Sequence, residues 1–379
     1  MSEQPLYQNI FNHLINGVRV GKYKTGDRLP TEKELAEEFG VSRITSKKAL
    51  NMMAENGMIK RIPGKGSFIS DDLDITKLPE VNCQENSRQN HTLIGVVLSD
   101  FRASYGTTLL SGIENEASRN NCFIIPRRSY SRQELEEKAI TELYELGVEG
   151  IIVMTAHGEN YNPRILRLVL DDFPVVFVDR YLKGIAAPFV GTDNVNAAKK
   201  ATDYLLGLGH RNISFISQYY TDTSALEARI EGFIESHAEH GVTVDKSIWL
   251  TNMSSTVPAK RGRESMLDDM EKIRRLLIDN PQITCLFAAE YDAALVAMEA
   301  VKALGKKVPD DISILTFDGP ENSLGNYFFT HIRQREFEMG AMAVKLILRQ
   351  MSRENTQNNN YDKVFLDSDL IISSSTRTI

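Results

Sequence analysis

The spacing of apolar residues divides the chain into a short helical part and a longer part in which strands and helices alternate. Between residues 6 and 20 apolar side chains recur every three or four positions, which predicts an amphipathic helix. Thr31, followed three residues later by Glu34, forms a capping-box pattern that predicts a second helix ending near residue 39. Ser42 is placed to cap a third helix.

The third helix is predicted to have a small apolar face and a basic face. Helical spacing puts two groups of side chains on opposite faces, namely Ser46, Ala49, Leu50 and Met53 on one and Ile44, Lys47, Lys48 and Asn51 on the other. Two short apolar runs, at residues 58–62 and 67–69, flank a Pro-Gly-Lys-Gly turn and predict a β-hairpin. Helices followed by such a hairpin indicate a winged helix-turn-helix.

The longer part of the chain is predicted to be an α/β fold. A polar stretch at residues 73–91 lacks periodicity and is interpreted as a linker between domains at 1–72 and 92–379. Apolar runs then predict strands at 93–98, 122–125, 150–154, 174–178, 213–217, 283–288 and 312–317. Helices are expected between them at 107–119, 133–146, 195–208, 225–240 and 293–304. This alternation predicts buried parallel sheets, and the length suits two lobes.

Charge is distributed unevenly along the chain. Residues 1–70 hold eleven Lys or Arg and seven Asp or Glu, a net charge of +4, so the remainder carries −11 of the total of −7. A basic module on an acidic body is typical of a protein in which one domain binds nucleic acid. No apolar run is long enough to span a membrane, and the N-terminus lacks a secretory signal pattern.

Other features narrow the function further. Three scattered cysteines, Cys83, Cys122 and Cys285, argue for a reducing compartment, so we expect a cytoplasmic protein. No nucleophile elbow, phosphate-binding loop or metal-binding motif is found, so we expect no enzyme activity, no metal and no cofactor.

Residues 5–70 resemble the winged helix-turn-helix of the GntR family. The resemblance rests on three motifs in order, GDRLPTEKELA at residues 26–36, VSRITSKKAL at 41–50 and GKGSFI at 64–69. It implies a DNA interface formed by Arg28, Thr31, Ser42, Arg43, Thr45, Ser46, Lys47, Gly64, Lys65 and Gly66. Ser46 replaces the usual apolar residue, and Lys47 replaces an Arg that could form paired hydrogen bonds with guanine, so base preference there can differ. The alternative for each basic side chain alone is an ordinary solvated helix face.

Residues 92–379 resemble the ligand-binding domain of LacI-family regulators. The segments that carry the resemblance are IGVV at 94–97, GVEGII at 147–152, VDR at 178–180, LGHRNI at 208–213, RIEGF at 229–233, VPDDISI at 308–314 and FD at 317–318. The resemblance implies a two-lobed periplasmic-binding-protein-like fold with a sugar in the cleft, held first by Arg229 and Asp318. Further cleft positions are Ser104, Tyr105, Asp179, Arg180, Glu290, Tyr291 and Gln334. Glu290-Tyr291 stands where the family has Asn-Asp, so the identity of the effector can be carried over from the family less directly.

Together the two resemblances imply a homodimeric repressor of carbohydrate-utilisation genes. A small sugar, with an arabinose-like pentose as first choice, would release it from a pseudo-palindromic operator. The alternatives are a ligand that acts as corepressor or activator, and an effector that is a non-pentose sugar or a sugar phosphate. Arg229 and Asp318 could instead form a structural ion pair, and Tyr105 could be a surface residue. An enzyme or a transport receptor is a less favoured class, because neither a catalytic constellation nor a signal peptide is found.

Overall fold

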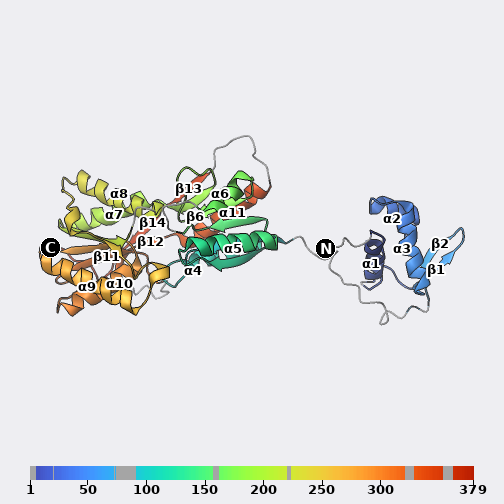
Figure 1. The fold of residues 1–379 in the computed structure, drawn as a ribbon, viewed down its shortest axis with the longest axis horizontal. Coiled ribbons are helices and arrows are strands. Elements are labelled where there is room, and N and C mark those ends of the chain that lie inside the picture. Colours follow the sequence, from blue (N-terminus) through green and yellow to red (C-terminus); the bar gives the residue numbers. More distant parts are fainter. Residues whose placement is uncertain are drawn as a thin grey trace. The chain divides into compact units, whose positions relative to one another are not determined.

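The computed structural model of the protein describes residues 6–19, 21–71, 73, 91–156, 162–219, 223–320, 328–352 and 362–379. The chain forms two compact units, residues 1–90 and 91–379 (Figure 1). Most of the predicted linker and Cys83 lie outside the described residues.

The first unit has the predicted helices and hairpin. In chain order its elements are α1 (Leu6–Arg19), α2 (Glu32–Glu38), α3 (Arg43–Glu55), β1 (Ile59–Ile62) and β2 (Gly66–Ile69). Thr31 and Glu34 form the expected capping box at the start of α2, and the Ser42 side chain accepts the Thr45 N–H at the start of α3. The core is formed by apolar residues from all three helices and the hairpin, including Ile10, Leu14, Leu35, Leu50 and Ile69.

The second unit contains two six-stranded sheets, each with helices on both faces. The first sheet has the order β13-β7-β6-β5-β3-β4. Its strands are β3 (Thr92–Leu98), β4 (Cys122–Arg128), β5 (Gly150–Val153), β6 (Val175–Val178), β7 (Phe189–Thr192) and β13 (Lys363–Leu366). Its helices are α4 (Thr107–Arg119), α5 (Gln133–Leu146), α6 (Pro163–Leu170) and α11 (Glu336–Met351). We call this assembly the first lobe.

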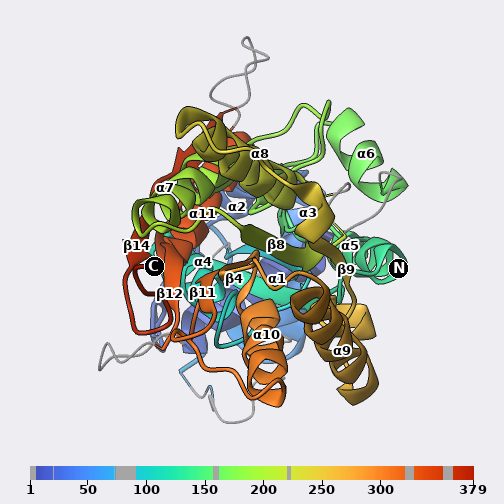
Figure 2. The same ribbon diagram turned by 90° about the vertical axis from the view of Figure 1, so that its left-hand side faces the viewer.

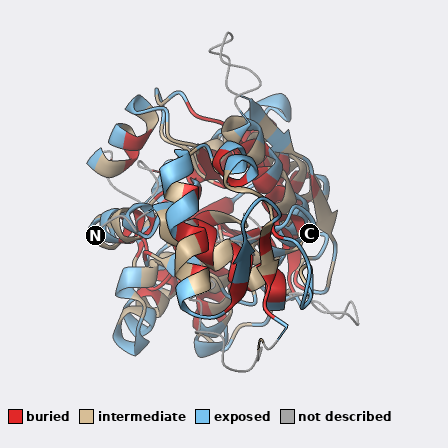
Figure 3. Ribbon diagram, turned by 90° about the vertical axis from the view of Figure 1, so that its right-hand side faces the viewer, coloured by how far each residue is buried: buried red, intermediate tan, exposed pale blue. Residues whose placement is uncertain are grey.

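The side chains of the central strands point alternately to the two faces of the sheet, which explains why helices cover both faces of the first-lobe sheet. Ile94, Val96 and Leu98 on β3 pack into one core with α4 and α11, whereas Val97 packs into another core with α5 and α6. Successive strand residues point to opposite faces, so a continuous apolar strand needs cover on both sides. In Figure 3 helices have buried residues on one side and exposed residues on the other.

The second lobe repeats this arrangement. Its sheet has the order β14-β12-β11-β10-β8-β9. The strands are β8 (Ile213–Gln218), β9 (Leu250–Met253), β10 (Cys285–Ala288), β11 (Ser313–Phe317), β12 (Thr330–Gln334) and β14 (Ser368–Ile371). Figure 2 shows helices α7 (Asn194–Gly207) and α8 (Ser224–Glu239) on one side, and α9 (Arg263–Asp279) and α10 (Tyr291–Ala303) on the other. Short 3-10 turns, η2 (Lys246–Ile248) and η3 (Pro258–Lys260), flank β9.

Three short connections join the lobes. The chain passes from β7 to α7 near residue 193, from β12 to α11 near residue 335, and from β13 to β14 near residue 367. All strand pairs within the two lobes are parallel except β12 with β14, which is antiparallel, so the predicted parallel α/β fold is confirmed with that one difference. No helix in the described residues is long and apolar enough to cross a membrane.

Several elements of the second unit were not predicted from the apolar pattern, namely α6, β7, β9, α9, β12, α11, β13 and β14. Helix α9 buries only Asp269, Ile273 and Leu277 and is otherwise rich in charge, so its apolar stripe is thin. Strand β13 lies at a sheet edge and alternates exposed and half-buried residues, which gives a weak signal.

Candidate functional site

The residues that the GntR resemblance implied lie around the start of α3 and the hairpin. Arg28, Arg43, Lys47 and Lys65 are exposed. Thr31 and Ser42 accept backbone N–H groups of their own helices, Glu34 N at 3.2 Å and Thr45 N at 3.2 Å. Helix N-termini capped in this way still offer further N–H groups to an anion.

The wing is tied to the helices by its backbone and by one arginine. Arg28 forms a bridge with Phe68, so the segment before α2 lies beside β2. Arg61 on β1 donates to Asn51 of α3 and forms an ion pair with Glu32 of α2. Gly64 and Gly66 at the turn both have positive φ, +73° and +117°, a conformation that glycine adopts readily. The hairpin therefore holds a defined position next to α3.

Ser46 is a correction to the predicted DNA interface. Its side chain is fully buried, and Oγ donates to the carbonyl of Glu32 at 2.7 Å, which joins α3 to α2. It belongs to the inner face of α3 with Ala49, Leu50 and Met53, the face that the spacing had predicted to be buried. A serine is tolerated at this buried position, where the family usually has an apolar residue, because its hydroxyl forms a hydrogen bond within the unit. The buried Ser46 side chain therefore cannot contact DNA.

A cavity in the second unit is lined by all nine residues of the predicted ligand site: Ser104, Tyr105, Asp179, Arg180, Arg229, Glu290, Tyr291, Asp318 and Gln334. Both lobes contribute, because Tyr105 and Asp179 come from the first lobe and Arg229 and Asp318 from the second. The cavity has a volume of about 110 Å³.

Asp179 and Asp318 occupy matching positions in the two lobes. Each follows a central strand, β6 or β11, and each has a φ of +65°. Their backbone N–H groups donate to the neighbouring strand, to Val190 O and Ile332 O, both at 2.9 Å. A positive φ is uncommon outside glycine, although Asp tolerates it, and such residues concentrate at functional sites. The two lobes thus present a matching pair of carboxylates, Asp179 and Asp318, to the same cavity.

Arg229 is a buried cation with a fixed orientation. Its Nε donates to Asn194 Oδ1 at 2.8 Å, its Nη1 donates to Ala289 O at 2.6 Å, and its guanidinium lies 3.9 Å from the centre of the Phe317 ring. These contacts use two of the five N–H donors of a guanidinium. Arg229 and Asp318, both described, form no ion pair with each other. The structure therefore does not bear out the alternative in which these two residues are a structural ion pair.

Asp318 is held by Gln334 of its own lobe, and the Gln334 amide also forms a hydrogen bond with the first lobe. Gln334 Nε2 donates to Asp318 Oδ1 at 2.8 Å, and Gln334 Oε1 accepts the hydroxyl of Thr192, in the first lobe, at 2.6 Å. Burial raises the pKa of Asp318 to about 6, and nearby Arg229 opposes that shift. The amide of Gln334 therefore links a cavity carboxylate to a connection between the lobes.

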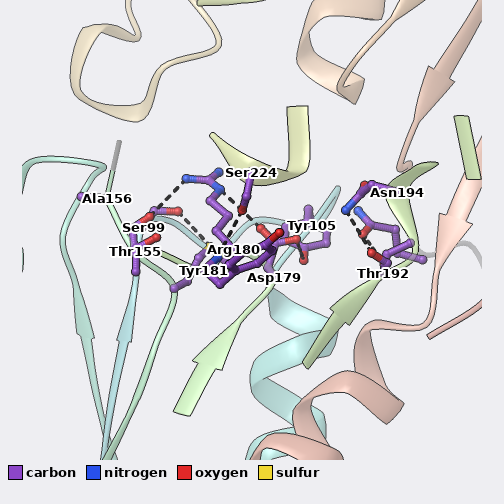
Figure 4. Close-up of polar contacts among 12 residues, drawn as sticks. Ser99, Tyr105, Thr155, Ala156, Asp179, Arg180, Tyr181, Thr192, Asn194 and Ser224 are labelled. Carbon is purple, nitrogen blue, oxygen red and sulfur yellow. Dashed lines mark hydrogen bonds and ion pairs between the residues drawn. The ribbon is translucent and has the colours of Figure 1, made fainter. Parts of the chain in front are cut away.

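The first-lobe side of the cavity is organised around Asp179 and Arg180. Tyr105 is partly buried and donates its hydroxyl to Asp179 Oδ1 at 2.7 Å, so it is not a simple surface residue. Arg180 Nε lies 3.4 Å from Asp179 Oδ2, and its Nη1 donates to Thr155 O at 3.5 Å. Figure 4 shows Arg180 extending beside Ser99 and Thr155, with Tyr105 beside Asp179.

Glu290 and Tyr291 stand at the start of α10, where the departure from the family pattern was noted. Burial is the main cause that raises the pKa of Glu290 to about 7; the nearby Thr256 hydroxyl opposes this shift, and the Asp292 carboxylate adds to it. Its Oε1 has no hydrogen-bond partner among the described residues. Buried polar atoms are normally satisfied by protein, water or ligand, so this carboxyl is suited to a polar ligand group.

An ion network that the sequence analysis missed connects the lobes at the cavity. Arg261 of the second lobe donates to Asp100 Oδ2 of the first lobe at 2.7 Å and to Asp292 Oδ2 of its own lobe at 2.9 Å. Arg102 of the first lobe lies 3.4 Å from each of the same two carboxylate oxygens. We call these four residues the interlobe ion cluster.

Other cavity residues were also missed: Ser99, Met154, Gln218, Thr223, Ala225, Leu226, Thr256 and Pro258. Asp100 had a usable signal, because it follows the strand β3 as Asp179 follows β6. Arg261 had none, since it lies in a loop whose position depends on how the two lobes meet.

Two families match the chain. Residues 91–351 match the family described as periplasmic binding proteins and sugar binding domain of LacI family. Residues 6–69 match bacterial regulatory proteins of the gntR family.

Similar proteins cover nearly the whole chain. An arabinose metabolism transcriptional repressor of Halalkalibacterium halodurans is 25% identical over 97% of this chain and 95% of its own length. Another protein of that name, from Geobacillus stearothermophilus, is 24% identical over 99% of this chain and 98% of its own. The crystal structure of the transcription regulator CcpA of Lactococcus lactis, 23% identical, covers 76% of this chain and 100% of its own with a TM-score of 0.64, which shows a shared fold. The chain therefore belongs to the family of periplasmic binding proteins and LacI-type sugar-binding domains, and it carries a GntR-type helix-turn-helix in its first unit.

Proposed function

We propose that the protein is a sugar-responsive transcriptional repressor of carbohydrate-utilisation genes. The observation that carries the proposal is a cavity to which both lobes contribute carboxylates and guanidinium groups, in the same chain as a winged helix-turn-helix. In this proposal α3 and the wing bind operator DNA, and the cavity binds the sugar that ends repression. The arabinose metabolism repressors that resemble the chain over nearly its whole length support the same assignment.

The chemistry of the cavity favours a neutral sugar over a sugar phosphate. Arg261 and Arg102 are neutralised by the carboxylates of the interlobe ion cluster, and Arg180 lies against Asp179. A phosphate would have to compete with these carboxylates and would be repelled by Asp318. Sugar hydroxyls, in contrast, donate to carboxylates and accept from Arg229. We take an arabinose-like pentose as the first effector to test.

The signal would pass through the contact between the lobes. A sugar bound to Asp179 in one lobe and to Arg229 and Asp318 in the other stabilises the closed arrangement. The three connections near residues 193, 335 and 367 are the places where a change in lobe angle alters the backbone. We further propose a homodimer, in which lobe closure changes how well two winged units match the half-sites of a pseudo-palindromic operator.

A ligand screen followed by a DNA-binding assay tests the proposal. The full chain is heated with arabinose, xylose, ribose, galactose and their phosphates, because a ligand bound to the native state raises the melting temperature. We expect a neutral sugar to raise it and the same sugar to release the protein from its operator in a gel shift. Stabilisation by phosphates alone would overturn the neutral-sugar assignment. Tighter operator binding on adding the sugar would reverse the sign of regulation.

A further inference from the structure

Ile44, the second residue of α3, is an exposed apolar side chain on the surface assigned to DNA. It is 80% exposed, whereas the other large exposed apolar residues described in this unit, Leu6 and Ile62, are 60% and 42% exposed. Single exposed apolar residues are common on protein surfaces, so exposure alone indicates nothing. What distinguishes Ile44 is its surroundings.

The outer face of α3 leaves few side chains to contact a partner. Lys48 is engaged by α1, since its Nζ lies 3.8 Å from the centre of the Tyr7 ring. Asn51 accepts a hydrogen bond from Arg61 of the wing. Ile44 and Lys47 are both exposed, three residues apart on this face, and no polar contact with other described residues engages Lys47.

The charge of this surface suits a polyanion. The first turn of α3 contains no acidic residue, and Arg43 and Lys47 flank Ile44 in the helix. A branched apolar side chain among cations suits a partner that is anionic overall but offers a small apolar group. The major groove of DNA has one such group, the C5 methyl of thymine, between two phosphate backbones.

We propose that Ile44 is a specificity-determining residue that contacts the C5 methyl of a thymine in the operator. The inference rests on the proposed function, in which α3 enters the major groove. A β-branched side chain in a helix is held in one strongly preferred rotamer, so the Ile44 methyl groups are fixed before binding. Its apolar contact complements Lys47, whose single charged group discriminates less between bases than an Arg would.

Replacing thymine by uracil removes the methyl group alone. An operator is first selected from random duplexes by the full chain, and each thymine of each half-site is then changed singly to uracil. We expect one such position per half-site to weaken wild-type binding about 4-fold, the effect of one lost methyl contact. The Ile44→Ala variant should bind the thymine and uracil operators equally. Ile62→Ala, a matched change on the wing, should retain the thymine preference.

The outcomes separate this inference from the function on which it rests. Operator binding by the wild type without any methyl dependence would overturn the role of Ile44 and leave the proposed function standing. A thymine preference that persists in Ile44→Ala would also overturn it. Failure to select any duplex would contradict both. Since Ile44 is 80% exposed, the melting curve of Ile44→Ala should coincide with that of the wild type. Ile44→Val, which keeps the β-branch, should restore part of the thymine preference.

Discussion

Replacing Arg229 by Ala should abolish the response to the sugar while leaving operator binding intact. Arg229 is 5% exposed, and its guanidinium is oriented by Asn194 Oδ1 at 2.8 Å and Ala289 O at 2.6 Å, which leaves three N–H donors for a ligand. Two charge-assisted hydrogen bonds to sugar hydroxyls are worth about 1.5–3 kcal/mol each. Their loss should weaken sugar binding by about 100-fold or more.

The same substitution also affects stability, so it needs a control. Asn194 Oδ1 and Ala289 O lose their partner, at a cost of about 1–3 kcal/mol each, which should lower the melting temperature by several degrees. Arg211→Ala is a matched control. Arg211 donates to the carbonyls of Leu206 at 2.8 Å and His210 at 2.9 Å but does not line the cavity.

Calorimetric titration with the sugar, together with a gel shift on the operator, checks this prediction. Folded Arg229→Ala protein should bind the operator as the wild type does and should not be released by the sugar. Arg211→Ala should be released normally despite its own loss of stability. Wild-type sugar affinity in a folded Arg229→Ala protein would refute the role given to this residue.

Three further predictions concern other parts of the chain. Arg43→Ala should weaken operator binding at least 10-fold and leave sugar binding unchanged in calorimetry, because Arg43 is exposed on α3; equal loss of both activities would contradict the division of labour. Burial, followed by the charge of Asp318, raises the pKa of Glu336 from its ordinary 4.5 to about 8. The free energy of unfolding should therefore fall as the pH rises from 4.5 toward 8, by at most about 5 kcal/mol. Thermal melts at several pH values should show this fall, and Glu336→Gln should make the melting temperature less dependent on pH. Gly112→Ala should destabilise the second unit by about 3 kcal/mol or more in urea unfolding, since its Cβ would lie 2.1 Å from Phe337 O, whereas Gly207→Ala, with open space around it, should not.

Local sequence signals predicted the framework of both units. Thr31 with Glu34, and Ser42 before Thr45, mark helix starts that depend only on neighbouring residues. Asp179 was predictable for a related reason, because parallel strands carry cleft residues at their carboxyl ends. Features set by nearby residues or by a single sheet were therefore accessible from the sequence.

Features that depend on how separate segments meet were not accessible. The family resemblance included Ser46 in the DNA interface although its spacing put it on the inner face of α3, and its hydrogen bond to the Glu32 carbonyl depends on how α2 and α3 meet. The contact of Arg261 with Asp100 joins residues 161 positions apart in two lobes, and no periodicity or motif marks it. The family resemblance located the cavity, whereas only the structure identified the ion cluster that crosses it.

The coupling between sugar and operator tests the central claim most directly. The dissociation constant of the full-length wild type for a fluorescent operator is measured by anisotropy, without sugar and at a saturating concentration of the sugar that stabilises the protein. The account predicts at least 10-fold weaker operator binding with sugar, and, by linkage, sugar binding weakened by the same factor when operator is present. Equal operator dissociation constants with and without the bound sugar would contradict it.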